Sequence, residues 1–189
     1  MSDPRTAPYG SWSSPITSDL IVASSIGLGE IFLDGADVYW LEFRPQEGGR
    51  SVVVRRAANG TAVDQTPAGF NVRTRVHEYG GGAYLASGGV VYFCNDADQR
   101  LYRQEPGAAP VAISSEPAQS RGMRYADGVI DAPRGRMICV REDHMAEAQE
   151  PENTLVELAV DGSRPQRVLQ SGRDFYAAPR LSPDGRRLA

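Results

Sequence analysis

The stretch Leu33–Leu41 reads Leu-Asp-Gly-Ala-Asp-Val-Tyr-Trp-Leu, and its pattern indicates the fold of the chain. A tight turn at its Asp-Gly pair leads straight into a run of β-branched and aromatic residues, which is typical of a hairpin and its second strand. The pattern returns three times, with its turn glycine at Gly89, Gly135 and Gly185. A repeat of about fifty residues is typical of the blades of a β-propeller, each of which is a four-stranded antiparallel sheet.

Each repeat also supplies the strands that complete a blade. The turns that would join them contain Asn59-Gly60, Gly107 and Asp161-Gly162, where the chain must reverse. The sequence therefore predicts an all-β protein, a partial β-propeller of about three four-stranded blades and the start of a fourth. A β-sandwich with coincidental spacing is the alternative, but sandwiches do not show the longer period. The expected third and fourth strands are Ser51–Arg56 and Thr61–Gln65, Arg100–Gln104 and Pro110–Ser114, and Thr154–Val160 and Gln166–Gln170.

The expected domain organisation is simple. Residues 20–189 should form the incomplete propeller domain, and residues 1–19 an N-terminal extension. A propeller protects its strand edges by closing a ring of about four to eight blades, and an unpaired edge is a template for aggregation. We therefore expect the sequence to be a fragment.

Composition excludes several classes of protein. With 41% hydrophobic and 23% charged residues, the chain is an ordinary globular sequence, and its net charge of −4 without a Lys/Arg block argues against a nucleic-acid partner. No apolar run approaches the length of a membrane span, and Met1–Trp12 lacks a signal-peptide core. The two cysteines, Cys94 and Cys139, lie in apolar runs and should be buried and reduced. These features predict a cytoplasmic protein with no membrane partner.

Several stretches spread over the chain are similar in sequence to one enzyme family: Ala7–Thr17, Phe70–Tyr84, Asp98–Tyr102, Arg124–Gly128, Cys139–His144 and Pro179–Ala189. They resemble bacterial serine peptidases of the prolyl oligopeptidase family, in the acylaminoacyl-peptidase and dipeptidyl-peptidase-like branch. The run Phe70–Tyr84 is the most specific of them.

The resemblance implies a two-domain enzyme in which an N-terminal propeller covers an α/β-hydrolase domain with a Ser-Asp-His triad. No Gly-x-Ser-x-Gly nucleophile elbow occurs in this sequence, so it should hold no catalytic residue and be inactive alone. The propeller would gate and orient peptide substrates for the hydrolase domain, its partner beyond Ala189. The alternative function is a stand-alone propeller that serves as a binding or scaffold module.

Neither a metal nor a cofactor is expected. His77 and His144 lack the spacing of metal ligands, and Asp96-Ala97-Asp98 lacks the other ligands of a calcium loop. Gly80-Gly81-Gly82 precedes a strand rather than a helix, so it should permit a close approach of two backbones instead of cradling a phosphate.

Two charged stretches at expected strand ends are the candidate site. Carboxylates there could hold the ammonium group of a peptide through charge-assisted hydrogen bonds. The alternative is structural, with these charges paired to Arg73, Arg75 or Arg141 to fix the loops. The candidate substrate-facing residues are His77, Glu78, Tyr79, Arg141, Glu142, Asp143 and His144.

Overall fold

The computed structural model describes residues 6–22, 25–145 and 150–189. These residues form three four-stranded antiparallel sheets and the segments that connect them. The first sheet contains β1 (Gly27–Asp34), β2 (Asp37–Arg44), β3 (Arg50–Arg56) and β4 (Ala62–Asp64). The second contains β5 (Tyr84–Ser87), β6 (Val90–Cys94), β7 (Leu101–Gln104) and β8 (Val111–Ala112). The third contains β9 (Met123–Asp131), β10 (Arg136–Asp143), β11 (Glu152–Ala159) and β12 (Arg167–Gln170).

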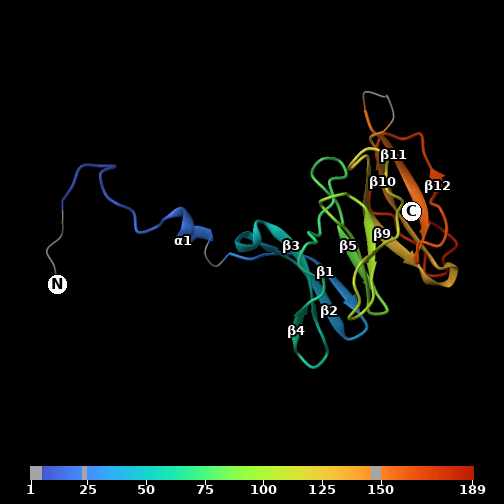
Figure 1. The fold of residues 1–189 in the computed structure, drawn as a ribbon, viewed down its shortest axis with the longest axis horizontal. Coiled ribbons are helices and arrows are strands. Elements are labelled where there is room, and N and C mark those ends of the chain that lie inside the picture. The colour runs from blue at the N-terminus through green and yellow to red at the C-terminus, as the bar shows by residue number, and fades with distance from the viewer. Residues whose placement is uncertain (1–5, 23–24, 146–149) are drawn as a thin grey trace.

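Within every sheet the strands pair in chain order, and the sheets stand side by side with β5 between β1 and β9 (Figure 1). In a β-propeller, the first strands of successive blades lie next to one another in this way around the central axis. Gly35, Gly89 and Gly135 lie in the connections between the first two strands of successive sheets, as predicted, and these three and Gly185 all have left-handed φ values between 59° and 80°. Glycine adopts this conformation without steric cost. The prediction of an all-β partial propeller is confirmed.

The fourth repeat is represented by a short turn at the end of the chain. An isolated antiparallel bridge joins Leu181 to Leu188 around the turn at Gly185. This turn lies against the third sheet: Arg134, in the connection between β9 and β10, donates a hydrogen bond to the carbonyl oxygen of Gly185. The expected start of a fourth blade is therefore present.

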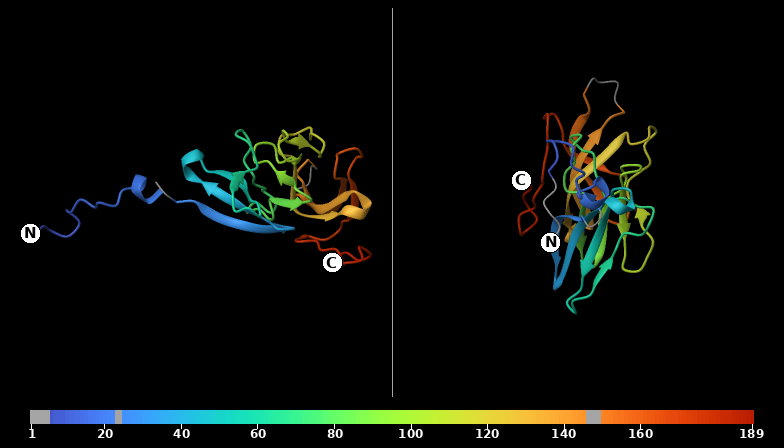
Figure 2. Two further views of the ribbon diagram at one scale, coloured as in Figure 1. Left: turned by 90° about the horizontal axis from the view of Figure 1, so that it is seen from below. Right: turned by 90° about the vertical axis from the view of Figure 1, so that its left-hand side faces the viewer.

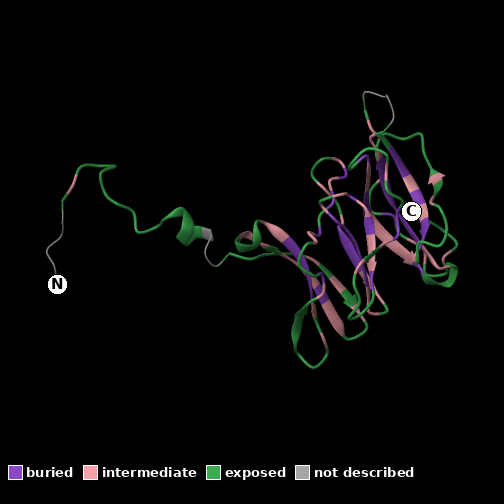
Figure 3. Cartoon of the chain, viewed as in Figure 1, coloured by how far each residue is buried: buried purple, intermediate pink, exposed green. Residues whose placement is uncertain are grey.

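The apolar core lies between adjacent sheets, as the buried stripes along the strands show (Figure 3). Tyr39 and Val53 of the first sheet pack with Phe93 of the second, while Tyr92 of the second packs with Met137 of the third. Burying such side chains between two sheet faces is the main stabilising contribution to the fold.

Cys94 and Cys139 lie on β6 and β10, inside the core between the second and third sheets. Both are buried and free, as predicted. Burial raises the pKa of Cys94 to about 12 and raises that of Cys139 as well, because a thiolate loses its hydration there.

Two glycines before β5 allow the second and third sheets to approach closely. The N–H of Gly82 donates to Oδ1 of Asp127 at 2.6 Å, and the N–H of Asp127 donates to the carbonyl oxygen of Gly82 at 2.9 Å. A Cβ at Gly82 would come within 3.0 Å of that carboxylate oxygen, and one at Gly81 within 3.1 Å of Ala126. The close backbone approach inferred from Gly80-Gly81-Gly82 is thus present.

The N-terminal segment, residues 6–22, leads away from the three sheets (Figures 1 and 2). It carries the short helix α1 (Ser18–Val22), where Thr17 Oγ1 accepts the N–H of Leu20. This helix crosses the expected boundary between residues 19 and 20, and the division into an extension and a domain stays a prediction. Over the described residues, no helix has the length and apolar character needed to cross a membrane.

Candidate functional site

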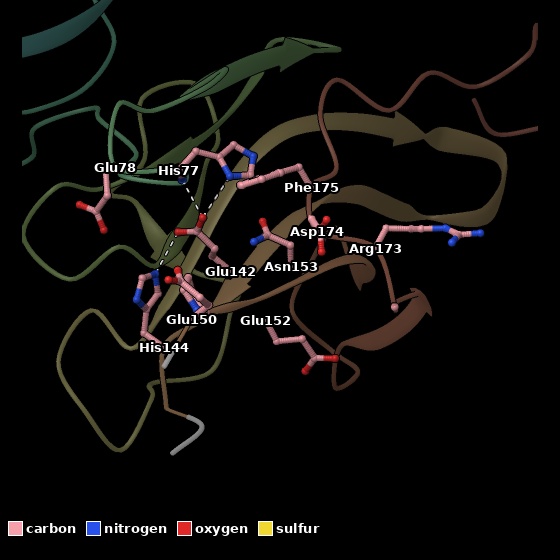
Figure 4. A pocket seen from close by; sticks show the side chains of 12 residues that line it. His77, Glu78, Glu142, His144, Glu150, Glu152, Asn153, Arg173, Asp174 and Phe175 are labelled. Carbon is pink, nitrogen blue, oxygen red and sulfur yellow. Dashed lines mark hydrogen bonds and ion pairs between the residues drawn. The ribbon is translucent and has the colours of Figure 1, made fainter. Parts of the chain in front are cut away.

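A pocket of about 700 Å³ opens at the end of the third sheet where β10 ends and β11 begins. Second-to-third strand turns and sheet-to-sheet connections all lie at this end, because the strands of each sheet alternate in direction. The pocket is therefore built from three segments that are far apart in sequence, as Figure 4 shows. Its lining residues are His77, Glu78, Glu142, His144, Glu150, Pro151, Glu152, Asn153, Gly172, Arg173, Asp174 and Phe175.

Glu142, on β10, is the buried centre of this site, with 2% of its surface exposed. The backbone N–H of His77 donates to its Oε1 at 2.7 Å, and His144 Nε2 lies 2.9 Å from its Oε2. Arg124 Nη1 stands 3.7 Å from the same Oε2. A buried carboxylate needs such partners to offset its lost hydration. Both oxygens of Glu142 are therefore engaged by the protein itself.

The loop that carries His77 and Glu78 adopts an unusual backbone conformation. Their φ values are 55° and 66°, in the left-handed region that residues with side chains seldom adopt. Glu142 holds His77 through the N–H, and Arg124 donates from Nη1 to the carbonyl oxygen of Arg75 at 2.8 Å and to Glu78 at 2.7 Å. Glu142 and Arg124 thus fix the loop that forms one wall of the pocket.

The imidazole of His77 joins this wall to the connection that follows β12. Its Nε2 lies 3.1 Å from the carbonyl oxygen of Tyr176, and its ring meets Phe175 edge to face with 5.2 Å between centroids. Nδ1 lies 3.1 Å from Glu142 Oε1 but has no aligned hydrogen bond. The ring is held in place by these contacts. Within the described segments, no group of three or more His, Cys, Asp or Glu side chains could hold a metal ion.

Glu78 is the most exposed of the candidate carboxylates, with 77% of its side chain accessible. The hydrogen bond from Arg124 lowers its pKa below the ordinary value for glutamate. The structure therefore pairs Glu78 with Arg124, which lies on β9, rather than with the arginines considered from the sequence, Arg73, Arg75 and Arg141.

Only four of the seven candidates line the pocket. Arg141 and Asp143 lie on the opposite face of β10 from Glu142, because side chains alternate along a strand, and Arg141 Nη2 stands 3.9 Å from Asp143 Oδ2. Tyr79 is 87% exposed and borders a separate hollow beside Gly80 and Gly81. His77, Glu78, Glu142 and His144 are the ones brought together.

Sequence reasoning missed the pocket residues whose charges are unpaired. In the described part of the chain, Glu150, Glu152 and Asp174 form no side-chain hydrogen bond or ion pair, and neither does Arg173. Asn153 is 4% exposed, and its Oδ1 has no hydrogen-bond partner. A signal existed, because Gly172–Phe175 occupies the connection after the fourth strand of the third sheet, and His77 occupies the same connection after the first sheet, two repeats earlier.

The fold is that of a partial β-propeller, and proteins of known structure share it. The chain matches a Mycobacterium tuberculosis puromycin-hydrolysing peptidase with a TM-score of 0.86 and 36% identity, over 98% of this chain and 30% of that one. Puromycin hydrolase matches with the same TM-score and identity over 97% of this chain and 30% of its own, and so does its mutant complexed with PGG.

The chain thus spans 30% of the length of these peptidases, and it corresponds to their N-terminal, propeller-like part. The resemblance to the propeller part of prolyl oligopeptidase family peptidases is confirmed for this chain. No protein-family model and no curated protein sequence matches it.

Proposed function

We propose that this chain is the propeller portion of a serine peptidase and that it gates and orients peptide substrates for an α/β-hydrolase domain of the same protein. The observation that supports this proposal is the pocket at the end of the third sheet, which combines a rigid, buried Glu142 with three unpaired carboxylates. An unpaired carboxylate has no protein cation to satisfy it, so it is free to bind the cation of a ligand.

The cation in question is the amino end of the substrate. Glu142 is occupied by His77 and His144, so we assign the contact to Glu150, Glu152 and Asp174. Puromycin, which the similar peptidases are named for, is an amide of an amino acid whose α-amino group is free. A charge-assisted hydrogen bond to such a group contributes about 1.5–3 kcal/mol, or roughly ten- to a hundredfold in affinity.

Gating is proposed from the position of the same pocket. The loop of His77 and the connection of Phe175 meet edge to face at one wall. A substrate that reaches the hydrolase domain from this end passes between ordered loops, which would admit a short, flexible peptide more readily than a folded protein.

The test uses the full-length protein with puromycin and N-acetylpuromycin, which differ only in the blocked amine. The double variant Glu150→Gln/Asp174→Asn should lose roughly ten- to a hundredfold in kcat/KM on puromycin and little on the acetylated form. The matched control is Glu116→Gln, which neutralises an exposed carboxylate outside the pocket and should change neither rate. Equal losses on both substrates would contradict the proposal.

The hydrolytic part of the proposal has its own test. The coding sequence after Ala189 should contain Gly-x-Ser-x-Gly followed by the Asp and His of a triad. The chain 1–189 by itself should hydrolyse neither peptides nor esters above background. A reading frame that holds further blades and no nucleophile elbow would instead favour the stand-alone binding module.

We also propose that the protein acts in the cytoplasm. Two free, buried cysteines and no disulfide between them suit a reducing compartment. Cell fractionation with an antibody against the full-length protein tests this, and recovery in the secreted or periplasmic fraction would contradict it.

A further inference from the structure

We propose that His77 is a proton-dependent latch, which holds the connection after β12 against the loop after β4 in mildly acidic solution and releases it in mildly alkaline solution. The latch is a property of the fold, and only its effect on substrate entry rests on the proposed function. Its parts are the ring of His77, the carboxylate of Glu142 on β10 and the backbone of Tyr176 after β12. Figure 4 shows the ring of His77 beside Glu142.

The two nitrogens of the His77 ring face two acceptors. Nε2 lies 3.1 Å from the carbonyl oxygen of Tyr176, and because a carbonyl oxygen only accepts, Nε2 carries a proton. Nδ1 lies 3.1 Å from Oε1 of Glu142 and is buried, with no hydrogen-bond partner in the described part of the chain. In a neutral ring that has its proton on Nε2, Nδ1 is itself an acceptor. The contact is therefore attractive only when His77 and Glu142 together take up one further proton.

Burial makes this proton matter to Glu142. The side chain of Glu142 is 3% exposed and that of His77 is 9% exposed, so water screens neither group well. Arg124 Nη1 stands 3.7 Å from Oε2 of Glu142, which is beyond hydrogen-bond distance. A buried carboxylate costs free energy unless a cation or a donor offsets its lost hydration. A protonated His77 supplies that cation at the oxygen that Arg124 does not approach.

His144 contacts the same carboxylate without the same requirement. Its Nε2 lies 2.9 Å from Oε2 of Glu142, so the N–H of a neutral ring satisfies both groups. Its side chain is 21% exposed, and neither of its ring nitrogens is a buried atom without a partner. His144 is therefore the matched control for His77. The other charged groups around the latch are Glu78, which is paired with Arg124, and the pocket residues Glu150, Glu152, Arg173 and Asp174.

The direction of the pH effect follows from these contacts. Histidine is the side chain that ordinarily changes charge between pH 5 and 8. Proton uptake strengthens the contact between His77 and Glu142, so the latch is complete at the acidic end of this range and is lost as the pH rises. The ring also meets Phe175 edge to face, so its release loosens the wall that the connection after β12 gives to the pocket.

Limited proteolysis of the full-length protein tests the latch. Trypsin cleavage after Arg173, in the connection after β12, is measured at pH 6 and pH 8 by mass spectrometry and divided by cleavage after Arg121. Arg121 is exposed in the segment before β9, outside the pocket, so the ratio cancels the pH dependence of trypsin itself. The ratio should rise about tenfold from pH 6 to pH 8, because cleavage follows the population of the open form and the latch is a charge-assisted contact.

Two glutamine variants assign that rise to one histidine. His144→Gln keeps a donor for Glu142 and should show the wild-type rise. His77→Gln keeps a donor for the carbonyl oxygen of Tyr176 but cannot take up a proton, so its ratio should change less than twofold. A flat wild-type ratio, or a rise that survives in His77→Gln, would overturn the latch.

A second variant and a second measurement complete the test. His77 has a φ of 55°, a conformation that asparagine adopts more readily than most residues, so His77→Asn is judged by the same ratio should the glutamine variant fail to fold. The pH profile of kcat/KM on puromycin separates the latch from gating. If the cleavage ratios are as expected but wild type and His77→Gln share one profile, the latch stands and the gating part of the proposed function falls.

Discussion

The two ends of the third sheet are both rich in charge, but they use it in opposite ways. At the end near Arg136, Asp131 accepts hydrogen bonds from Arg134 and Arg136, and Glu157 accepts from Arg136 and Arg167. At the other end, where β10 finishes, the acidic side chains of the pocket outnumber the cations that contact them.

This contrast separates the charges that maintain the fold from the charges that are available to a ligand. A carboxylate between two arginines is already satisfied, and a substrate would have to displace an existing partner. Asp174, with no partner among the described residues, has none to lose. Glu142 stands between these cases, because it lies inside the pocket but is bonded like the structural acids. Burial and partner count, rather than position in a pocket, assign its role.

The largest expected effect is on the reactivity of the two cysteines, which lie in the core between the two ends of the third sheet. With the pKa of Cys94 raised to about 12, its thiolate fraction at neutral pH is about a thousandfold below that of an ordinary cysteine. Modification of Cys94 and Cys139 by a thiol reagent should be slower by at least that factor in the native protein than in denaturant. Rapid labelling under native conditions would mean that the two ends are not divided by a dry core.

Removing the buried acid should be the most destabilising charge substitution. Glu142→Ala leaves the buried N–H of His77 without its acceptor and removes the carboxylate beside His144, so we expect a loss of about 1–3 kcal/mol in the free energy of unfolding. Glu142→Gln retains an oxygen for the His77 N–H and should lose less. Chemical denaturation of the full-length protein measures both, and a loss below about 1 kcal/mol for the alanine variant would place Glu142 with the ligand-binding acids.

The arginine-rich end should show a smaller, pH-dependent effect. The hydrogen bond from Arg167, followed by that from Arg136, lowers the pKa of Glu157, so its ion pairs stabilise the folded state above the ordinary carboxylate pKa and are lost as the pH falls through the lowered value. Because Glu157 is partly exposed and screened, Glu157→Gln should cost less than about 1 kcal/mol at pH 7. The difference from wild type should shrink as the pH falls below the ordinary glutamate value of about 4.3 and should vanish once the pH is below the lowered pKa. A difference that persists there would indicate packing rather than charge.

The unpaired acids should contribute least to stability. Asp174→Asn breaks no hydrogen bond or ion pair of the described structure, so its free energy of unfolding should stay within about 0.5 kcal/mol of wild type. The same variant should weaken kcat/KM on substrates with a free amine. A marked drop in melting temperature would show that Asp174 is structural and would remove the contrast between the two ends.

Much of the blade architecture was predictable because its signals are local. The turn at Gly89 and the run Val90–Phe93 lie side by side in the chain, and a hairpin depends on little else. The strand ends were less accurate: β8 covers only Val111–Ala112, whereas the sequence suggested Pro110–Ser114. Pro110 has no N–H to donate, and the outermost strand has a neighbour on one side only.

The candidate site was predictable only in part. His77 and Glu142 were both named from the sequence, but nothing local shows that they meet across 65 positions of chain. Arg141 and Asp143 were expected beside them but lie on the other face of β10. Alternation along a strand predicts which residues share a face, but which face meets the pocket is set by the pairing of β10 with β9 and β11. Asn153 had no motif to mark it, and Asp174 was marked only by its place in the connection after a fourth strand.

The repeat, the turn positions, the all-β class and the burial of the cysteines follow from the sequence, since each depends on turn chemistry or on a hydrophobic run. Which charges are partnered follows only from the folded arrangement of the sheets. Whether Glu78 meets Arg75 or Arg124, and whether Glu142 is engaged while Asp174 is not, depends on how sheets distant in sequence pack. Charge pairing acts over a few ångströms in space, and separation along the chain does not report that distance.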